Sequence, residues 1–243
     1  MEQEPKRILV TGGAVRLGRA LVESFAELGY EVAIHCHRHR AEADALAARL
    51  EPTTRACVFA ADLRQPMEAQ ELIDRVEATL GPLSALVLSA GTFEATPIGA
   101  LDTERVSEAI RLNLVAPLLL ATRAGQRMRE RGHGSILALL DYSTERPRPE
   151  YLPYEVAKGG LETLVRGLAR ALAPEVRVNG LALGAVLLPE GSSIEFIERV
   201  RGASLLERLG TPGDVSEAAR YLVDGAPFVT GAILRIDGGR ALR

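Results

Sequence analysis

Tyr154 and Lys158, in the segment "YEVAK", have the residue types and the spacing of a proton-transfer site. Residues four apart lie on the same face of a helix, so both side chains point the same way if this segment is helical. The chain has one other lysine, Lys6, and arginine fills every remaining basic position, which indicates that position 158 requires lysine. A neighbouring ammonium lowers the pKa of a phenol, and lysine also binds ribose hydroxyls. The pair therefore predicts that Tyr154 donates or relays a proton, with a pKa below that of free tyrosine.

The segment "TGGAVRLG", residues 11–18, follows a short apolar stretch and opens a helical pattern. Glycines at such a place let the backbone approach a pyrophosphate, and the helix N-terminus offers free N–H groups and the positive end of its dipole. A glycine cluster also fits an ordinary turn between a strand and a helix. Its position after the first strand of an alternating chain favours dinucleotide binding.

Three of the four histidines lie in the segment "AIHCHRHRAEADAL". On a continuing strand His35, His37 and His39 would share one face, which is a possible geometry for zinc. Arg38 and Arg40 would bring positive charge close to that metal, and no carboxylate lies among these residues, so we expect no metal site. A solvated basic turn is a second alternative.

Recognition of the 2′-phosphate of NADPH is the alternative that we favour for this segment. In a dinucleotide-binding fold the end of the second strand faces the adenosine ribose, where an acidic residue selects NAD and cationic groups select NADP. The first acidic residue after this strand is Glu42. His37 and Arg38, joined by Arg16 from the glycine loop, therefore predict a 2′-phosphate site.

The composition favours a protein that binds something small. With 243 residues the chain can form one large α/β domain, and we expect residues 1–243 to be a single domain. The net charge of −3 is spread along the chain, which argues against nucleic acid or an anionic membrane as partner. We recognise no signal peptide and no apolar span for a bilayer. Cys36 and Cys57 give no disulfide framework, so we expect a cytoplasmic protein.

Short apolar runs alternate with segments of helical period along the whole chain. We expect strands at 7–11, 31–36, 56–60, 85–89, 135–140, 176–182 and 232–237, and helices at 17–29, 41–50, 67–80, 103–131, 154–173 and 214–224. This alternation predicts a single doubly wound Rossmann-type α/β domain, a seven-stranded parallel sheet with helices on both faces. The least regular stretch, 184–212, is a candidate flap over a site at the strand ends.

These motifs resemble the short-chain dehydrogenase/reductase family over essentially the whole chain. The family's TGxxxGxG loop resembles residues 11–18, its Asn-Asn-Ala-Gly turn resembles "LSAG" at 88–91, and its YxxxK pair is similar to Tyr154 and Lys158. The helix asparagine of the family matches Asn113 in "LNLVAP". The pair Asp62 and Leu63, the segment "VRVNG" and the segment "VTGAILRIDGG" also resemble it.

The departures from the family pattern narrow the resemblance. Arg16 replaces the middle glycine of the loop, Leu88 and Ser89 replace the two asparagines, and Leu183 stands where proline is common. Asp141 lies thirteen residues before Tyr154, where most members have a catalytic serine. Arginine in the loop, His-x-His-Arg at the strand end and Asp in place of serine resemble the pteridine reductase branch, and bacterial dihydromonapterin reductases in particular.

The resemblance implies an NADPH-dependent reductase of a dihydropterin such as dihydromonapterin, dihydrobiopterin or dihydrofolate. The hydride would go to the ring carbon of a C=N bond, and Tyr154 would supply or relay the proton. Lys158 would hold the ribose and tune Tyr154, Asp141 would bind the pterin edge or shuttle protons, and Asn113 would organise a water chain behind the lysine. Phe93, just after the fourth strand, would stack on the pterin.

The resemblance also implies a cofactor site and an assembly. The expected cofactor-binding residues are Gly12, Arg16, Leu17, His37, Arg38, Asp62, Leu63, Ala90, Gly91, Lys158 and Gly184. Similar enzymes are tetramers joined through the helices expected at 103–131 and 154–173, so we expect a homotetramer.

Three alternatives stay open at this point. Phe93 also fits a generic core position, because loop aromatics often only pack. The chain could instead reduce a carbonyl such as a 3-oxoacyl thioester, although a carboxylate at Asp141 would repel the developing oxyanion. A non-catalytic NADP-binding regulator is the third, and the retention of Asn113, Tyr154 and Lys158 argues against it.

Overall fold

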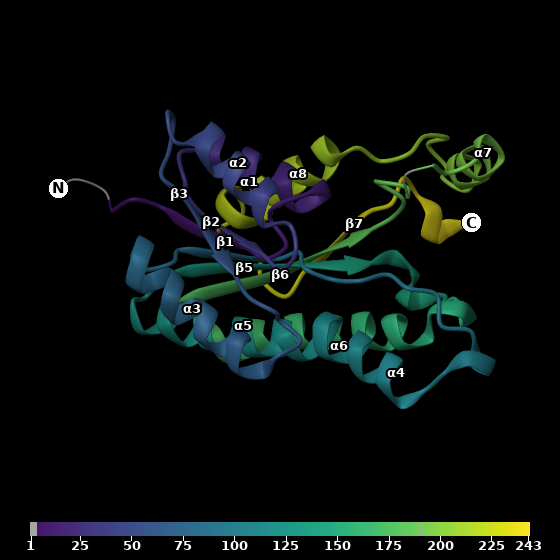
Figure 1. The fold of residues 1–243 in the computed structure, drawn as a ribbon, viewed down its shortest axis with the longest axis horizontal. Coiled ribbons are helices and arrows are strands. Elements are labelled where there is room, and N and C mark those ends of the chain that lie inside the picture. Colours follow the sequence, from purple (N-terminus) through teal and green to yellow (C-terminus); the bar gives the residue numbers. More distant parts are fainter. Residues whose placement is uncertain (1–3, 190) are drawn as a thin grey trace.

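The computed structural model describes residues 4–189 and 191–243 as a sheet of seven parallel strands with helices on both sides (Figure 1). The order of the strands in the sheet is β3-β2-β1-β4-β5-β6-β7. The predicted doubly wound fold and its seven strands are confirmed. The strands are β1 (Arg7–Val10), β2 (Glu31–Cys36), β3 (Ala56–Ala60), β4 (Ala85–Leu88), β5 (Gly134–Asp141), β6 (Val176–Leu183) and β7 (Ile233–Ile236).

Two apolar cores hold the helices against the sheet. Side chains alternate between the faces of a strand, so Leu9 of β1 packs with α3 (Pro66–Leu80), α5 (Ala116–Glu130) and α6 (Leu152–Leu172). Ile8 and Val10 pack on the other face with α1 (Arg16–Glu27), α2 (Arg40–Leu50) and α8 (Pro212–Arg220). Both layers are visible in Figure 1. The strands carry apolar residues on both faces because both faces are covered.

The helical segment expected at 103–131 differs from the prediction in its middle. It consists of α4 (Thr103–Ile110), one π-helical turn at Arg111–Val115 and α5. A second π turn, Tyr221–Gly225, follows α8. A π turn inserts one extra residue into a helix, and apolar periodicity does not register that insertion.

The stretch 184–212, expected to be irregular, contains the helix α7 (Ile194–Gly202). Ser193 caps it by accepting a hydrogen bond from the Phe196 N–H at 3.2 Å. The helix lies at one end of the molecule, beside the C-terminal segment (Figure 1). Residue 190 of the expected flap lies outside the described residues. Within the described part of the chain, none of the helices has the length and apolar character needed to cross a membrane.

The strand order reverses beside β1, which has β2 on one side and β4 on the other. In open parallel sheets the crevice at such a reversal, beyond the carboxyl ends of the strands, is the usual ligand site. The loops after β1, β2, β4 and β5 leave the sheet at this edge. They carry most of the residues that the sequence singles out.

Candidate active site

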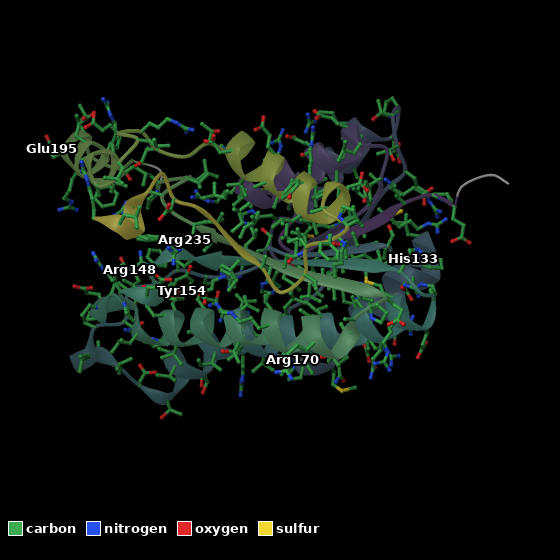
Figure 2. The ribbon with its side chains drawn as sticks, turned by 180° about the vertical axis from the view of Figure 1, so that it is seen from behind. His133, Arg148, Tyr154, Arg170, Glu195 and Arg235 are labelled. Atoms are coloured by element: carbon green, nitrogen blue, oxygen red, sulfur yellow. The ribbon has the colours of Figure 1, made fainter. Side chains whose placement is uncertain are left out.

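Tyr154 and Lys158 lie in the first turns of α6, as their spacing predicts. The Tyr154 hydroxyl donates a hydrogen bond to Asp141 Oδ2 at 2.9 Å. The buried Lys158 ammonium donates to the Leu139 carbonyl oxygen at 2.7 Å and lies 5.6 Å from the centroid of the Tyr154 ring. The end of β5 therefore anchors both side chains. Figure 2 shows Tyr154 beside Arg148 at one end of the molecule, with His133 at the other.

Asp141 has no acceptor position left for a further donor. Its Oδ1 accepts from the Ser143 N–H at 2.9 Å and lies 2.6 Å from the Ser143 hydroxyl, while its Oδ2 accepts from Tyr154 and from Arg148 Nη2 at 3.1 Å. An ionised carboxylate offers about four lone-pair positions. In this conformation Asp141 contacts Tyr154 directly, and a bound molecule could pair with its oxygens only by displacing one of these partners.

Phe93 is not a core residue, because it is 50% exposed. Its ring stacks on Tyr151 at 4.2 Å between centroids and 9° between planes, and it meets Tyr154 edge to face at 4.9 Å. The Arg148 guanidinium lies 4.8 Å from the Phe93 centroid and 5.2 Å from that of Tyr151. Because these two distances are nearly equal, the guanidinium sits at the side of the stacked pair. Phe93 keeps exposed aromatic surface next to the Tyr154 ring.

Asn113 is buried in the π turn between α4 and α5. Its Nδ2 donates to the Ala109 carbonyl oxygen at 3.0 Å, and its Oδ1 accepts from the Thr92 N–H at 3.3 Å. A Cβ at Gly91 would lie 2.6 Å from Asn113 Oδ1, so only glycine fits there. The asparagine thus ties the helix to the loop after β4. A water chain from it to Lys158 remains a prediction.

The glycine loop lies against the loop after β4 at the point where the strand order reverses. The Thr11 hydroxyl accepts hydrogen bonds from the Ser89 and Ala90 N–H groups at 2.9 and 3.0 Å. Gly12 has a φ of +66°, and a Cβ on it would lie 3.1 Å from Ala90 Cα. A Cβ at Gly18 would come 2.0 Å from the Gly12 carbonyl oxygen. This close backbone at the start of α1 fits a pyrophosphate.

The three histidines of the segment 33–46 do not share a strand face, because β2 ends at Cys36 and only His35 belongs to it. His35 is buried, with Nδ1 accepting from the Gly12 N–H at 2.9 Å and Nε2 lying 3.1 Å from the Ala61 carbonyl oxygen. Burial lowers the pKa of His35 to about 4, so the ring is neutral at physiological pH. Both ring nitrogens contact backbone groups, so His35 holds the glycine loop in place.

The side chains beyond β2 form an exposed cationic end. His37 and Arg38 are exposed, and His37 Nε2 lies 3.8 Å from Asp62 Oδ2. Asp62 is held by Arg64, whose Nη2 donates to it at 2.8 Å, and this hydrogen bond lowers the pKa of Asp62 to about 2. Within residues 4–189 and 191–243, Arg38 makes no hydrogen bond or ion pair. The absence of a free acid here fits an NADP site rather than an NAD site.

Arg16 has a left-handed backbone, with a φ of +52°, where the family motif has glycine. Its Nη2 donates to the Leu187 carbonyl oxygen at 3.1 Å, so the guanidinium reaches the segment after β6. Leu17 is partly buried and packs beside this loop, and Leu63 is buried in the segment after β3. The Gly184 N–H donates a hydrogen bond to the Ile236 carbonyl oxygen at 2.9 Å. All the predicted cofactor-binding residues except Lys158 thus lie in segments that directly follow β1, β2, β3, β4 or β6.

Comparison with known proteins identifies the family. Residues 13–241 match the family described as Enoyl-(Acyl carrier protein) reductase, a group within the short-chain dehydrogenases/reductases. The chain belongs to the short-chain dehydrogenase/reductase family.

Similar proteins cover the whole chain. FolM alternative dihydrofolate reductase 1 of Brucella suis, solved in complex with NADP, has a TM-score of 0.92 and 33% identity over 98% of this chain and 96% of its own. Dihydromonapterin reductase of Enterobacter sp. (strain 638) is 29% identical over the full length of both chains. Ketoacyl reductase 2 of the granaticin polyketide synthase of Streptomyces violaceoruber is 32% identical over 96% of this chain and 95% of its own. The predicted enzyme class and cofactor are confirmed: the protein is an NADP-dependent oxidoreductase.

The predicted direction of the Tyr154 pKa shift is wrong. Burial, and then the charge of Asp141 and the hydrogen bond to it, raise the pKa of Tyr154 above that of free tyrosine. The Lys158 ammonium bonds to Leu139 rather than to the phenol oxygen, and burial lowers its own pKa to about 8. The phenol is therefore protonated at physiological pH and, with Asp141 beside it, holds its proton more tightly than free tyrosine does.

Four residues of the site escaped the sequence analysis: Ser143, Arg148, Tyr151 and Glu155. The Arg148 side chain donates from Nε to the buried Glu155 at 2.7 Å and from Nη2 to the Ser143 hydroxyl at 2.8 Å. In the sequence, Glu155 looks like a solvent-exposed acid in the first turn of a helix, where acids are common. Tyr151, three residues before Tyr154, carried a signal, because the chain has only five tyrosines.

Proposed function

We propose that this short-chain reductase uses NADPH to reduce a C=N bond of a dihydropterin to the tetrahydro form. The single observation that carries the proposal is the contact between Tyr154 and Asp141 at 2.9 Å, beside a half-exposed aromatic ring at Phe93. A pterin is a flat ring whose reacting nitrogen needs a proton donor, and these residues offer a stacking surface and a donor. The likeness to a dihydromonapterin reductase and to FolM supports the same substrate class.

The residues divide the work of the reaction. Bound NADPH supplies the hydride that the ring carbon receives. Tyr154 gives its proton to the adjacent ring nitrogen, and Asp141, hydrogen-bonded to the phenol, holds it in place. Lys158 binds the nicotinamide ribose with the ammonium hydrogens that Leu139 does not use. Asn113 organises water behind the lysine.

The cofactor residues act at the two ends of NADPH. Gly12, Leu17, Ala90 and Gly91 bring backbone close to the pyrophosphate and the nicotinamide half. At the other end, Arg38 and His37 bind the 2′-phosphate, and Arg16 exchanges its contact with the Leu187 carbonyl for this phosphate. Asp62, Leu63 and Gly184 line the rest of the cofactor. We expect Leu187, whose carbonyl oxygen loses this contact, to shift when the cofactor binds.

A second candidate is the reduction of a 3-oxoacyl thioester, which the 32% identity to a ketoacyl reductase favours. The expected obstacle is Asp141. A carbonyl oxygen gains negative charge during reduction, and a carboxylate hydrogen-bonded to the proton donor at 2.9 Å repels that charge. A nitrogen that takes up a proton meets no such repulsion.

The test is a substrate panel with the purified protein. NADPH oxidation is followed with dihydromonapterin, dihydrobiopterin and dihydrofolate beside acetoacetyl thioesters and simple ketones. We expect turnover with at least one dihydropterin at a kcat/KM well above that of every carbonyl compound. Turnover confined to the carbonyl compounds would overturn the pterin assignment in favour of the second candidate.

We further propose that the enzyme is a homotetramer in the cytosol. Leu118 on α5 and Val156 on α6 are exposed apolar side chains on the helices that the family resemblance assigns to the interface. Light scattering of the purified protein tests this, with a mass four times that of one chain expected. A monomer at all concentrations would contradict it.

A further inference from the structure

The Ser143 hydroxyl lies between two carboxylates, although it has only one hydrogen to give. Its Oγ is 2.6 Å from Asp141 Oδ1 and 2.9 and 2.8 Å from the two carboxylate oxygens of Glu155. The same Oγ accepts from Arg148 Nη2 at 2.8 Å. If the hydroxyl donates to one carboxylate, the other faces an oxygen at hydrogen-bonding distance with no hydrogen between them. A second proton, carried by one of the carboxyl groups, resolves this conflict.

The surroundings favour one shared proton. Glu155 is 4% exposed and Asp141 is largely buried, so water solvates neither of two adjacent negative charges well. Arg148 is the one cation that contacts both carboxylates among the described residues. The Lys158 ammonium, which acts on Asp141 through its charge alone, bonds to a backbone carbonyl. Tyr154 faces Asp141 as a neutral donor.

We propose that Asp141 and Glu155 hold one proton between them through the Ser143 hydroxyl, and that this proton replaces the one that Tyr154 gives to the substrate. Glu155 and Ser143 are then positioning residues that act through Asp141. This inference rests on the proposed function for its use in turnover, although the shared proton itself can be observed without substrate.

The contacts form a continuous chain from Glu155 through Ser143 and Asp141 to the Tyr154 oxygen. As hydride forms the new C–H bond, the O–H bond of Tyr154 breaks and an N–H bond forms on the ring. The proton of the carboxyl pair then moves to the phenolate oxygen from Asp141, after the carboxyl group rotates to turn its protonated oxygen from Ser143 toward Tyr154. Both carboxylates are then ionised beside Arg148, and one proton from solvent restores the pair. The sum is one hydride and one proton consumed for each C=N bond reduced.

The first test is the pH dependence of kcat for Glu155→Gln, with a dihydropterin as substrate. Glutamine keeps the size of the side chain and removes the negative neighbour of Asp141, so Asp141 holds its proton less strongly. The alkaline limb of kcat is expected to move to lower pH by about one unit or more. The KM for NADPH is expected to stay unchanged, which a general loss of structure would not give.

Glu162→Gln is the matched control on the same helix. Glu162 also accepts a hydrogen bond from a hydroxyl, that of Thr144, and pairs with Arg166, but it does not contact Asp141. Its pH profile is expected to match that of the unmodified enzyme. Equal profiles for Glu155→Gln and the unmodified enzyme would overturn the inference.

The second test needs no turnover. Carboxyl ¹³C NMR of the full-length protein is expected to show one protonated Asp or Glu carboxyl at neutral pH, lost in both Glu155→Gln and Asp141→Asn. A spectrum in which every carboxyl is ionised would overturn the shared proton. If the protonated carboxyl is present but no dihydropterin is reduced, the proposed function fails and the shared proton stands.

Discussion

The end of β2 and the corner between β5 and α6 are built in opposite ways. At the end of β2, Arg38 is exposed and makes no hydrogen bond or ion pair in the described part of the chain. At the corner, all the acceptor positions of Asp141 are used, and Arg148 contacts two carboxylates. In the proposed function a phosphate binds at the first region, whereas the contacts of the second region are already formed. We therefore expect substitutions at the end of β2 to change the choice of cofactor without changing the fold. At the corner between β5 and α6, we expect the reaction to depend on several residues at once.

The assembled corner should give the largest loss when its proton donor is removed. Tyr154→Phe keeps the ring that packs on Phe93 but has no proton to transfer, so kcat is expected to fall by about 10²- to 10⁴-fold. NADPH affinity, followed by nicotinamide fluorescence, should stay nearly intact. Near-full activity in this variant would end the catalytic assignment and favour an NADP-binding regulator.

Asp141→Ser should give the next largest effect on dihydropterin reduction. Serine restores the residue type common in the family but leaves Arg148 and Tyr154 without their shared acceptor. A lost hydrogen bond to a charged group costs about 1.5–3 kcal/mol, so kcat/KM should fall about 10- to 100-fold. Carbonyl reduction should fall less or rise. Equal losses for both substrate classes would show that Asp141 does not discriminate between them.

A substitution at the exposed end of β2 should change the choice of cofactor without loss of stability. Arg38→Glu replaces the cation that we propose binds the 2′-phosphate by a repelling charge, so kcat/KM for NADPH should fall about tenfold or more while that for NADH changes little. Arg40→Glu is the control, because Arg40 pairs with Asp44 at 2.8 Å on the adjacent helix. If both variants lose NADPH efficiency equally, the effect is general electrostatics rather than a phosphate site.

Phe93→Ala should have the smallest effect. A stacking contact contributes about 0.5–1.5 kcal/mol beyond area burial, so the dihydropterin KM should rise about two- to tenfold with little change in kcat. Phe228, which is fully exposed and outside the site, supplies the control Phe228→Ala. A kcat loss at Phe93 with an unchanged KM would instead point to support of Tyr154 through their edge-to-face contact.

The same contrast explains what the sequence could predict. The seven strands, the glycine loop and the Tyr154–Lys158 pair follow from local patterns, since each depends on spacing within one segment. The cationic residues after β2 can be predicted for the same reason, because they follow one another in one segment. Glu155 and Arg148 could not be found this way, because their roles depend on Ser143 and Asp141 meeting them across a turn. The raised pKa of Tyr154 has the same origin, since burial depends on the folded neighbours and not on Lys158 alone.

The π turn at Asn113 was also invisible to periodicity. Helical spacing before and after it remains regular enough to indicate one continuous helix. Only the folded chain shows that the extra residue lets Asn113 reach Thr92 in the loop after β4. The sequence shows Asn113 as a polar residue within an apolar helical segment. Such a residue indicates a buried polar contact, but the sequence does not show which residue it contacts.

Transfer of isotope tests the central claim most directly. The enzyme is supplied with NADPH carrying deuterium at the transferable C4 position, together with a dihydropterin, and the product is examined by mass spectrometry. The account predicts one deuterium on a ring carbon of the tetrahydropterin in the unmodified enzyme and almost none with Tyr154→Phe in the same time. Deuterium that appears only in the alcohol formed from a carbonyl compound, and never in the pterin, would contradict it.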